Sequence, residues 1–274
     1  MAQKIYHKPA FNWWVKSVLK KRSRIISLVM KRNAEYLNKI YKFEIAVLKS
    51  VTQAYALDKK NGNTLWADSI SKEMKDVSHA FKKLESGEIV PIGYQRVNCN
   101  MIFDVKMEYF RRKARLVAVG HVVDNPETIT YAGEVSRETV RIALKLASLN
   151  DLPVKVAYIQ NSYTTAPTTE KIWKVLGQEF GEDAERKSIV VQALYGLKSA
   201  GSDFWNHLAY CMHNLGFFSC PSDLDIWMKL MVRPEDGFDY YAYVLIYVYD
   251  VMVIHNDAAS VIWRIYKYFK FNPS

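Results

Sequence analysis

The sequence predicts an α+β protein in which helices pack on one face of a mostly antiparallel sheet. Short runs rich in β-branched and aromatic residues alternate with segments whose apolar positions recur at helical spacing. The alternation ends in two apolar runs, residues 243–248 and 251–254, whose short link predicts a tight hairpin. The chain is also 50% hydrophobic and 14% aromatic, which is ample for a packed core.

The terminal hairpin places an acidic residue at its expected turn, Tyr249-Asp250. A carboxylate at the exposed end of two buried strands can serve as a metal ligand. Aspartate is also common in hairpin turns for conformational reasons alone. The residue by itself therefore leaves both interpretations open.

The net charge of +10 is concentrated in residues 1–50, which hold twelve Lys or Arg and two acidic residues. The rest of the chain is balanced, with 26 basic and 26 acidic residues. A basic block attracts nucleic-acid phosphates by counterion release. A solvated tail or a nuclear-import patch at Lys20–Arg24 is an equal alternative. We expect residues 1–50 to form a basic, partly ordered arm.

Three cysteines, Cys99, Cys211 and Cys220, give an odd number and fit a reducing compartment. The spacing of Cys211 and Cys220 around His213 does not match paired zinc ligands. The N-terminus lacks a secretory signal pattern, and no apolar run reaches transmembrane length. We expect an intracellular protein, nuclear or cytoplasmic, that is not secreted and has no membrane partner; its oligomeric state stays open.

The first helix with a clear apolar face is predicted from Thr64 to about Leu84. Its apolar positions are Trp66, Ile70, Met74, Val77 and Phe81. A turn at Asn61–Asn63 precedes it, Thr64 is its expected cap, and Ser86-Gly87 is its expected end.

Two strands follow, at residues 101–106 and 111–119. The second begins with four bases in five residues, Arg111, Arg112, Lys113 and Arg115. These side chains form a candidate phosphate-binding site. The alternative is an edge strand protected by charge against aggregation.

The remaining elements complete the alternation. A helix is predicted from Ser136 to about Asn150, with strands at residues 154–159 and 188–195. Gly196 and Gly201 bracket a loop that would let the backbone approach a ligand closely. Ser202 is the expected cap of a further helix, which Gly216 ends.

Four of these segments, in this order, resemble the reverse transcriptase of Copia-type retrotransposons. Residues 113–118 resemble its K-A-R-L-V-A fingers strand, and residues 194–198 match its L-Y-G-L-K loop letter for letter. Residues 247–250 resemble its Y-V-D-D hairpin, and residues 158–163 resemble the segment that carries its first catalytic aspartate. The resemblance spans roughly residues 101–257 and implies a fingers-palm fold that makes DNA on an RNA template.

The resemblance also implies roles for single residues. Lys113 and Arg115 would meet the incoming dNTP, and Tyr163 would lie beneath its sugar. Lys198, with Gly196 and Gly201, would lie near the template and the nucleotide. Each has a plain alternative: Lys113 and Arg115 as charges that protect an edge, Tyr163 as a core residue, and Lys198 as an ordinary loop base.

The catalytic positions depart from the family pattern. The family holds two Mg²⁺ ions with three carboxylates, which correspond to positions 158, 249 and 250, so the order of the motifs predicts that residue 158 lies beside the turn at residues 249–250. Here Tyr158 and Tyr249 occupy two of them and only Asp250 remains. A tyrosine, with a reference pKa of about 10, offers a neutral phenol near neutral pH. We therefore expect Mg²⁺ not to be bound productively and Asp250 to be at most a weak metal ligand.

We interpret residues 51–274 as a truncated reverse transcriptase, with fingers at about 51–150 and palm at about 151–274. The expected function is that of a retrotransposon-derived RNA-directed DNA polymerase domain that is catalytically impaired, with template-primer and dNTP as its partners by resemblance. The alternatives are a non-catalytic nucleic-acid-binding protein derived from it and a relic without function.

Overall fold

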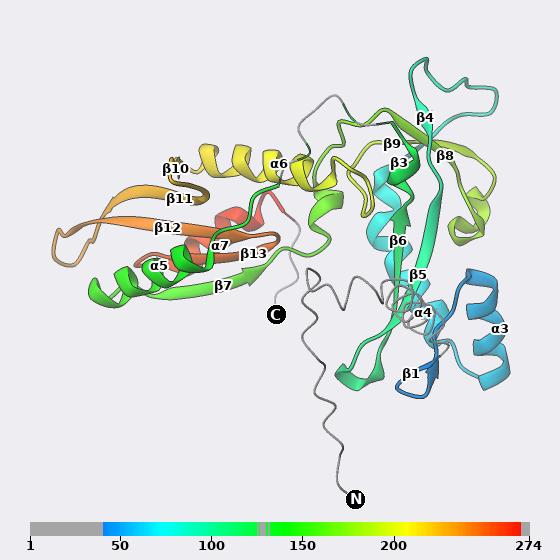
Figure 1. Ribbon diagram of the computed structural model, residues 1–274, viewed down its shortest axis with the longest axis horizontal. Coiled ribbons are helices and arrows are strands. Elements are labelled where there is room, and N and C mark those ends of the chain that lie inside the picture. The colour runs from blue at the N-terminus through cyan, green and yellow to red at the C-terminus, as the bar shows by residue number, and fades with distance from the viewer. Residues whose placement is uncertain (1–40, 125, 127–129, 131, 270–274) are drawn as a thin grey trace, which may run out of the picture.

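A computed structural model describes residues 41–124, 126, 130 and 132–269. In these ranges the protein is a mixed α+β structure, and its mostly antiparallel strands gather with the helices into two regions (Figure 1). The expectation of an α+β fold is confirmed at this level. The expected basic arm lies outside the described residues except for positions 41–50.

The first region begins with a small hairpin, β1 (Tyr41–Lys42) and β2 (Ile45–Ala46), and two helices, α3 (Val51–Asn61) and α4 (Leu65–Val77). Gly62 ends α3 with φ +64°, which confirms the predicted turn. The side chain of Thr64 does not cap α4, contrary to the prediction. The Oδ2 atom of Asp58 accepts from the backbone N–H groups of Trp66 (2.9 Å) and Ala67 (2.8 Å) instead.

The predicted helix to Leu84 is too long. α4 ends at Val77, a 3₁₀ turn spans Ser78–Ala80, and β3 (Phe81–Lys83) follows. β3 pairs with β9 (Lys187–Val190), which is itself shorter than the predicted strand 188–195. Because this pairing joins segments far apart in the sequence, local helical spacing could not reveal it. β8 (Ile172–Val175) and β4 (Gln95–Arg96) complete this sheet, in the order β3-β9-β8-β4.

The two strands predicted at residues 101–106 and 111–119 are present as β5 (Cys99–Val105) and β6 (Arg112–Ala118), which pair as an antiparallel hairpin. Its outer edge is covered by α4, because the N–H groups of Ala114 and Leu116 donate to Ser69 Oγ (2.7 Å) and Glu73 Oε1 (2.8 Å). Since these donors have partners, β6 is not the open edge strand that charge would have to protect.

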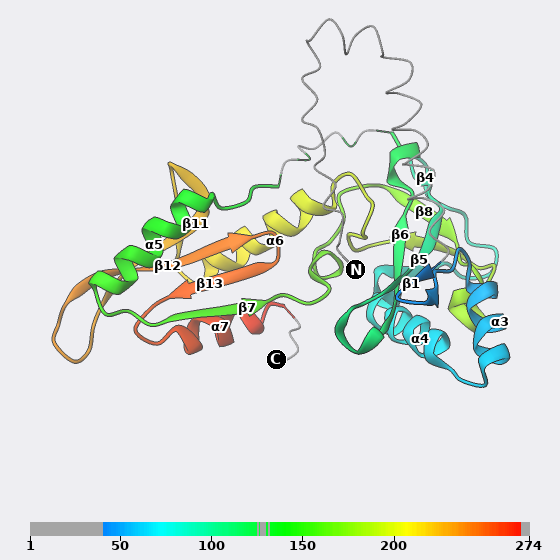
Figure 2. The ribbon, with the colours of Figure 1, turned by 60° about the horizontal axis from the view of Figure 1, so that its bottom comes forward.

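The second region contains a wholly antiparallel sheet, β10-β11-β12-β13-β7 (Figure 2). In chain order its strands are β7 (Val154–Tyr158), β10 (Phe218–Cys220), β11 (Asp223–Val232), β12 (Asp239–Tyr247) and β13 (Asp250–Ile254). Alternate side chains of β12, such as Ala242 and Val244, are fully buried, while Tyr241 and Tyr247 are exposed. The sheet therefore has a core face and a more open face.

Three helices belong to this region: α5 (Arg137–Leu149), α6 (Ala200–Asn214) and α7 (Ala258–Tyr266). Ser136 caps α5 as predicted, since its side chain accepts from the N–H of Thr139. Ser202 does not cap α6, which begins earlier and has Ser199 at its N-cap position. Gly216 follows α6 with φ +79° and confirms the predicted end.

Two hydrophobic clusters form the core. One joins the five-stranded sheet to α5, α6 and α7, and the other joins α4 to the β5–β6 hairpin and to Ile172, Val190 and Leu197. Tyr163 is packed against both clusters. The expected division of the chain near residue 150 stays a prediction. None of the helices in the described ranges is long and apolar enough to cross a membrane.

Candidate functional site

The turn between β12 and β13 differs by one residue from the predicted one. Its two loop residues are Val248 and Tyr249, and Asp250 is already the first residue of β13, paired with Tyr247. Val248 has φ +55°, a backbone conformation that is rare and strained for a β-branched residue. The short link thus forms a tight turn at the cost of local strain.

Tyr158 lies directly opposite Asp250, because β7 pairs antiparallel with β13. The N–H of Ile159 donates to the carbonyl oxygen of Tyr249 (2.9 Å). The rings of Tyr158 and Tyr249 are in edge contact, with centroids 5.1 Å apart. The expected meeting of positions 158, 249 and 250 at one place is confirmed.

The two phenols stand beside the carboxylate of Asp250. Burial raises the pKa of Tyr158, and the neighbouring Tyr249 and Asp250 raise it further, while Arg115 opposes them. The Tyr158 phenol therefore keeps its proton more firmly than a free tyrosine does. Tyr158 is 45% exposed, so its ring is accessible from solvent.

A second pair of tyrosines links this turn to β6. Tyr163 packs against Tyr195, with ring centroids 4.8 Å apart, and lies near Phe204 at 6.2 Å. The guanidinium of Arg115 stands 4.1 Å from the ring centre of Tyr195, which is close enough for a cation–π contact. Burial raises the pKa of Tyr195 to about 12 although Arg115 opposes it. The structure thus brings Arg115 to a group of neighbouring tyrosines, which we call the tyrosine cluster: Tyr158, Tyr163, Tyr195 and Tyr249.

Lys113 lies two residues before Arg115 on β6. Burial and the nearby Arg115 lower the pKa of Lys113, whereas Glu73 of α4 opposes the shift. The pKa of Glu73 is raised by burial, although its bond from the Leu116 N–H and the charge of Arg115 act in the opposite direction. These charges lie between α4 and the tyrosine cluster.

The loop that begins at Gly196 packs closely against the backbone at the end of β6. Gly196 has φ +92°, and a Cβ added to it would lie 2.1 Å from the carbonyl oxygen of Ala118. A Cβ on Gly120 would similarly meet the carbonyl oxygen of Gly196 at 2.3 Å. The N–H of Ala118 donates to the Tyr195 carbonyl (2.7 Å), so the end of β6 is held against this loop.

The other two loop residues have separate positions. Lys198 donates from Nζ to the carbonyl oxygen of Val123 at 2.7 Å. Gly201 does not bracket the loop as predicted, because it lies within the first turn of α6, where an added Cβ would come 3.0 Å from the Ala132 side chain. The proposed roles of Lys198 and Gly201 near a template stay predictions.

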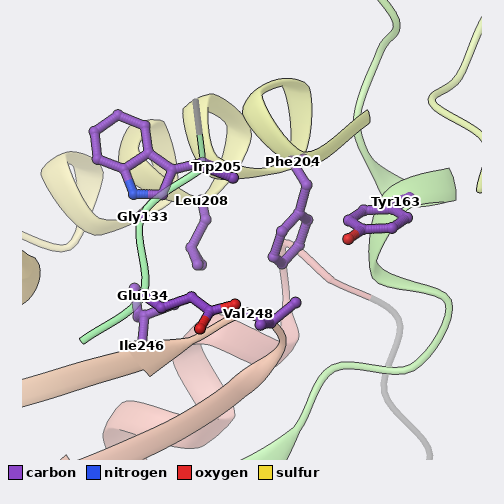
Figure 3. A pocket seen from close by; sticks show the side chains of 10 residues that line it. Gly133, Glu134, Tyr163, Phe204, Trp205, Leu208, Ile246 and Val248 are labelled. Carbon is purple, nitrogen blue, oxygen red and sulfur yellow. The ribbon is translucent and has the colours of Figure 1, made fainter. Parts of the chain in front are cut away.

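A cavity of about 90 Å³ lies behind the hairpin turn. Its walls include Glu134, Tyr163, Phe204, Trp205 and Val248. Figure 3 shows the Glu134 carboxylate reaching toward Val248 and the Tyr163 hydroxyl turned toward the same space. The sequence alone does not indicate Glu134, because only its backbone pairing with Tyr247 brings it here. No local motif signals that pairing.

The side chains at the turn do not fit a two-metal centre. Mg²⁺ favours several hard oxygen ligands, chiefly carboxylates, and two tyrosine side chains beside one carboxylate do not supply that set. In the described part of the chain, no group of three or more His, Cys, Asp or Glu side chains is placed to hold a metal ion.

Comparison with known proteins supports a retrotransposon origin. No family model matches the chain. The chain is 27% identical over 172 residues to the "Retrovirus-related Pol polyprotein from transposon RE1" of Arabidopsis thaliana. The match covers 59% of this chain and 11% of that relative, so the chain spans about a tenth of the relative's length.

Proposed function

We propose that this chain is a reverse-transcriptase fingers-palm unit of Copia-type origin that has lost polymerase activity and retained nucleic-acid binding. The observation that carries the proposal is the meeting of Tyr158, Tyr249 and Asp250 on β7 and at the β12–β13 turn. In the family that the four motifs resemble, the same three positions hold the catalytic carboxylates. The similarity to a transposon Pol polyprotein supports the same origin.

The loss of activity follows from the chemistry of the two tyrosines. Metal-dependent polymerisation needs a pair of ions that aligns the attacking hydroxyl and stabilises the leaving pyrophosphate. The raised pKa of Tyr158 keeps its phenol neutral, so it adds no charge to the single carboxylate of Asp250.

The retention of nucleic-acid binding is supported by the groups that face the same site. Arg115 lies over Tyr195 and acts electrostatically on Tyr158 and Tyr163. Lys113 adds a second cation on the same strand. Cations beside partly exposed aromatic rings suit a nucleotide chain, because phosphates and bases can be bound without a metal.

The first test is primer extension by the purified full chain with Mg²⁺ or Mn²⁺. We expect no extension from the unmodified protein, and robust synthesis by it would contradict the proposal. The double substitution Tyr158→Asp and Tyr249→Asp should restore the ligand set. Either single substitution should remain poor, because ligands that act as a unit have non-additive effects.

Metal binding should be measured before extension, by calorimetry on the double variant with primer-template and nucleotide present. A matched control carries Tyr210→Asp and Tyr241→Asp, which add the same charge at exposed tyrosines of α6 and β12. We expect the site variant to bind divalent ions and the control to behave like the unmodified chain. Equal metal binding by both double variants would rule out the assignment of positions 158 and 249.

A further inference from the structure

The turn of the β5–β6 hairpin exposes an unusual set of side chains. Tyr109 is 98% exposed, Met107 75% and Phe110 51%. Figure 2 shows this turn at the outer end of the hairpin, beside β1. The ring of Phe43, from the β1–β2 turn, lies 5.7 Å from that of Phe110. We call the three exposed residues of the hairpin turn, together with Phe43, the tip patch.

The backbone holds these rings outward in a strained conformation. Tyr109 and Phe110 have φ +55° and +48°, which lie in the left-handed region that aromatic residues seldom adopt. Such strain persists where the surrounding structure imposes it, and it is often associated with function. Here two consecutive aromatic residues carry the strain while remaining largely open to solvent.

Basic residues flank the rings of the tip patch on both sides in the sequence. Residues 104–113 hold four bases, Lys106, Arg111, Arg112 and Lys113, against two acids. Asp104 is already engaged by Lys42 and Lys106 in salt bridges. The guanidinium of Arg112 donates to the carbonyl oxygen of Phe110 (2.9 Å), so one base is held against the backbone of the turn. Glu108 is the other acid, so the turn presents aromatic faces where bases outnumber acids by four to two.

We propose that the tip patch binds single-stranded nucleic acid, with unpaired bases stacked on Tyr109 and Phe110 and phosphates held by Lys106 and Arg111. Stacking requires a base whose face is free, which a single strand offers and a duplex covers. The patch lies apart from the tyrosine cluster at β7 and β13, so it forms a second contact. The inference rests on the proposed function only in taking nucleic acid as the ligand.

The test uses the full chain and fluorescence anisotropy with a labelled single-stranded oligonucleotide and its duplex. Tyr109→Gly removes the ring and relieves the positive φ, so a loss of binding is not explained by misfolding. We expect Tyr109→Gly to bind the single strand about tenfold more weakly, with a smaller effect on the duplex. Tyr109→Phe should retain binding. Arg111→Gln should reduce the slope of log affinity against log salt concentration by about 0.7.

Tyr210→Ala is the matched control, because Tyr210 is a 63% exposed tyrosine on α6. Equal single-strand affinities for Tyr109→Gly and Tyr210→Ala would overturn the inference. The inference would also be overturned if Tyr109→Gly weakened binding to phosphatidylserine vesicles but left oligonucleotide binding unchanged. If Arg115→Gln weakens oligonucleotide binding and Tyr109→Gly does not, the tip patch is excluded and the nucleic-acid binding in the proposed function stands. Primer extension by the unmodified chain would remove only the proposed loss of activity.

Discussion

The β12–β13 and β5–β6 turns have similar backbone strain and opposite surroundings. Val248, at the β12–β13 turn, has φ +55°, as does Tyr109 at the β5–β6 turn. The first turn is packed, with Tyr249 against Tyr158 and a small cavity behind it. The second leaves Tyr109 98% exposed among basic residues. A packed turn can position groups for chemistry, whereas an open turn can only offer a surface to a ligand.

The largest expected effect is at the end of β6, where the backbone at Ala118 lies against Gly196. This contact brings Arg115 to the packed turn. Gly196→Ala should cost about 3 kcal/mol or more of unfolding free energy, because a Cβ would lie 2.1 Å from the Ala118 carbonyl oxygen. Gly87→Ala is the matched control, since Gly87 has a similar φ of +89° and no atom within 4 Å of an added Cβ. Urea unfolding measures both, and equal losses would mean that the close backbone approach does not matter.

The buried phenols near the packed turn predict a loss of stability at high pH. Folding raises the pKa of Tyr195 from 10.0 to about 12, so the unfolded chain releases this proton first. Stability from the neutral phenol is therefore intact below pH 10 and is lost as the pH rises toward 12. Tyr195→Phe should retain of the order of 2 kcal/mol more stability near pH 12 than the unmodified chain does, relative to neutral pH. Circular dichroism during alkaline titration checks this, and parallel titration curves would contradict it.

The β5–β6 hairpin packs against α4. The start of α4 depends in turn on Asp58. Asp58→Ala should destabilise the protein by about 1–2 kcal/mol, because the N–H groups of Trp66 and Ala67 would lose their acceptor. Thr64→Ala should cost less, since the Thr64 hydroxyl donates to Asp68 and does not cap the helix. Thermal unfolding of the two variants measures the difference. A larger loss for Thr64→Ala would show that the predicted cap was the right one.

The smallest expected change in stability comes from replacing the strained residue of each turn with glycine. Tyr109→Gly should raise stability by about 1 kcal/mol, because it relieves a strained residue whose ring packs little. Val248→Gly should gain less, since it also removes a side chain that lines the cavity. Chemical denaturation of both variants tests this order. The reverse order would show that the exposed ring contributes packing that its exposure does not suggest.

Local sequence patterns predicted the elements that local chemistry controls. Ser136 caps α5, Gly62 ends α3 and Gly216 follows α6, because capping hydroxyls and left-handed glycines act within a few residues. The order of motifs also predicted that residues 158 and 250 would meet, and β7 does pair with β13. The sequence could not predict that Phe81–Lys83 would leave a helical pattern, because β3 is stabilised by β9, over a hundred residues later.

The sequence by itself determined which groups this protein offers for chemistry: one aspartate, two tyrosines and a basic strand. Only the tertiary structure decided where those groups lie relative to one another. It holds the end of β6 against Gly196, sets Arg115 over Tyr195 and places Glu134 beside the packed turn. It also leaves Tyr109 in solvent. The physical reason is that side-chain identity fixes charge and shape locally, whereas burial and proximity arise from strands that pair across long stretches of the chain.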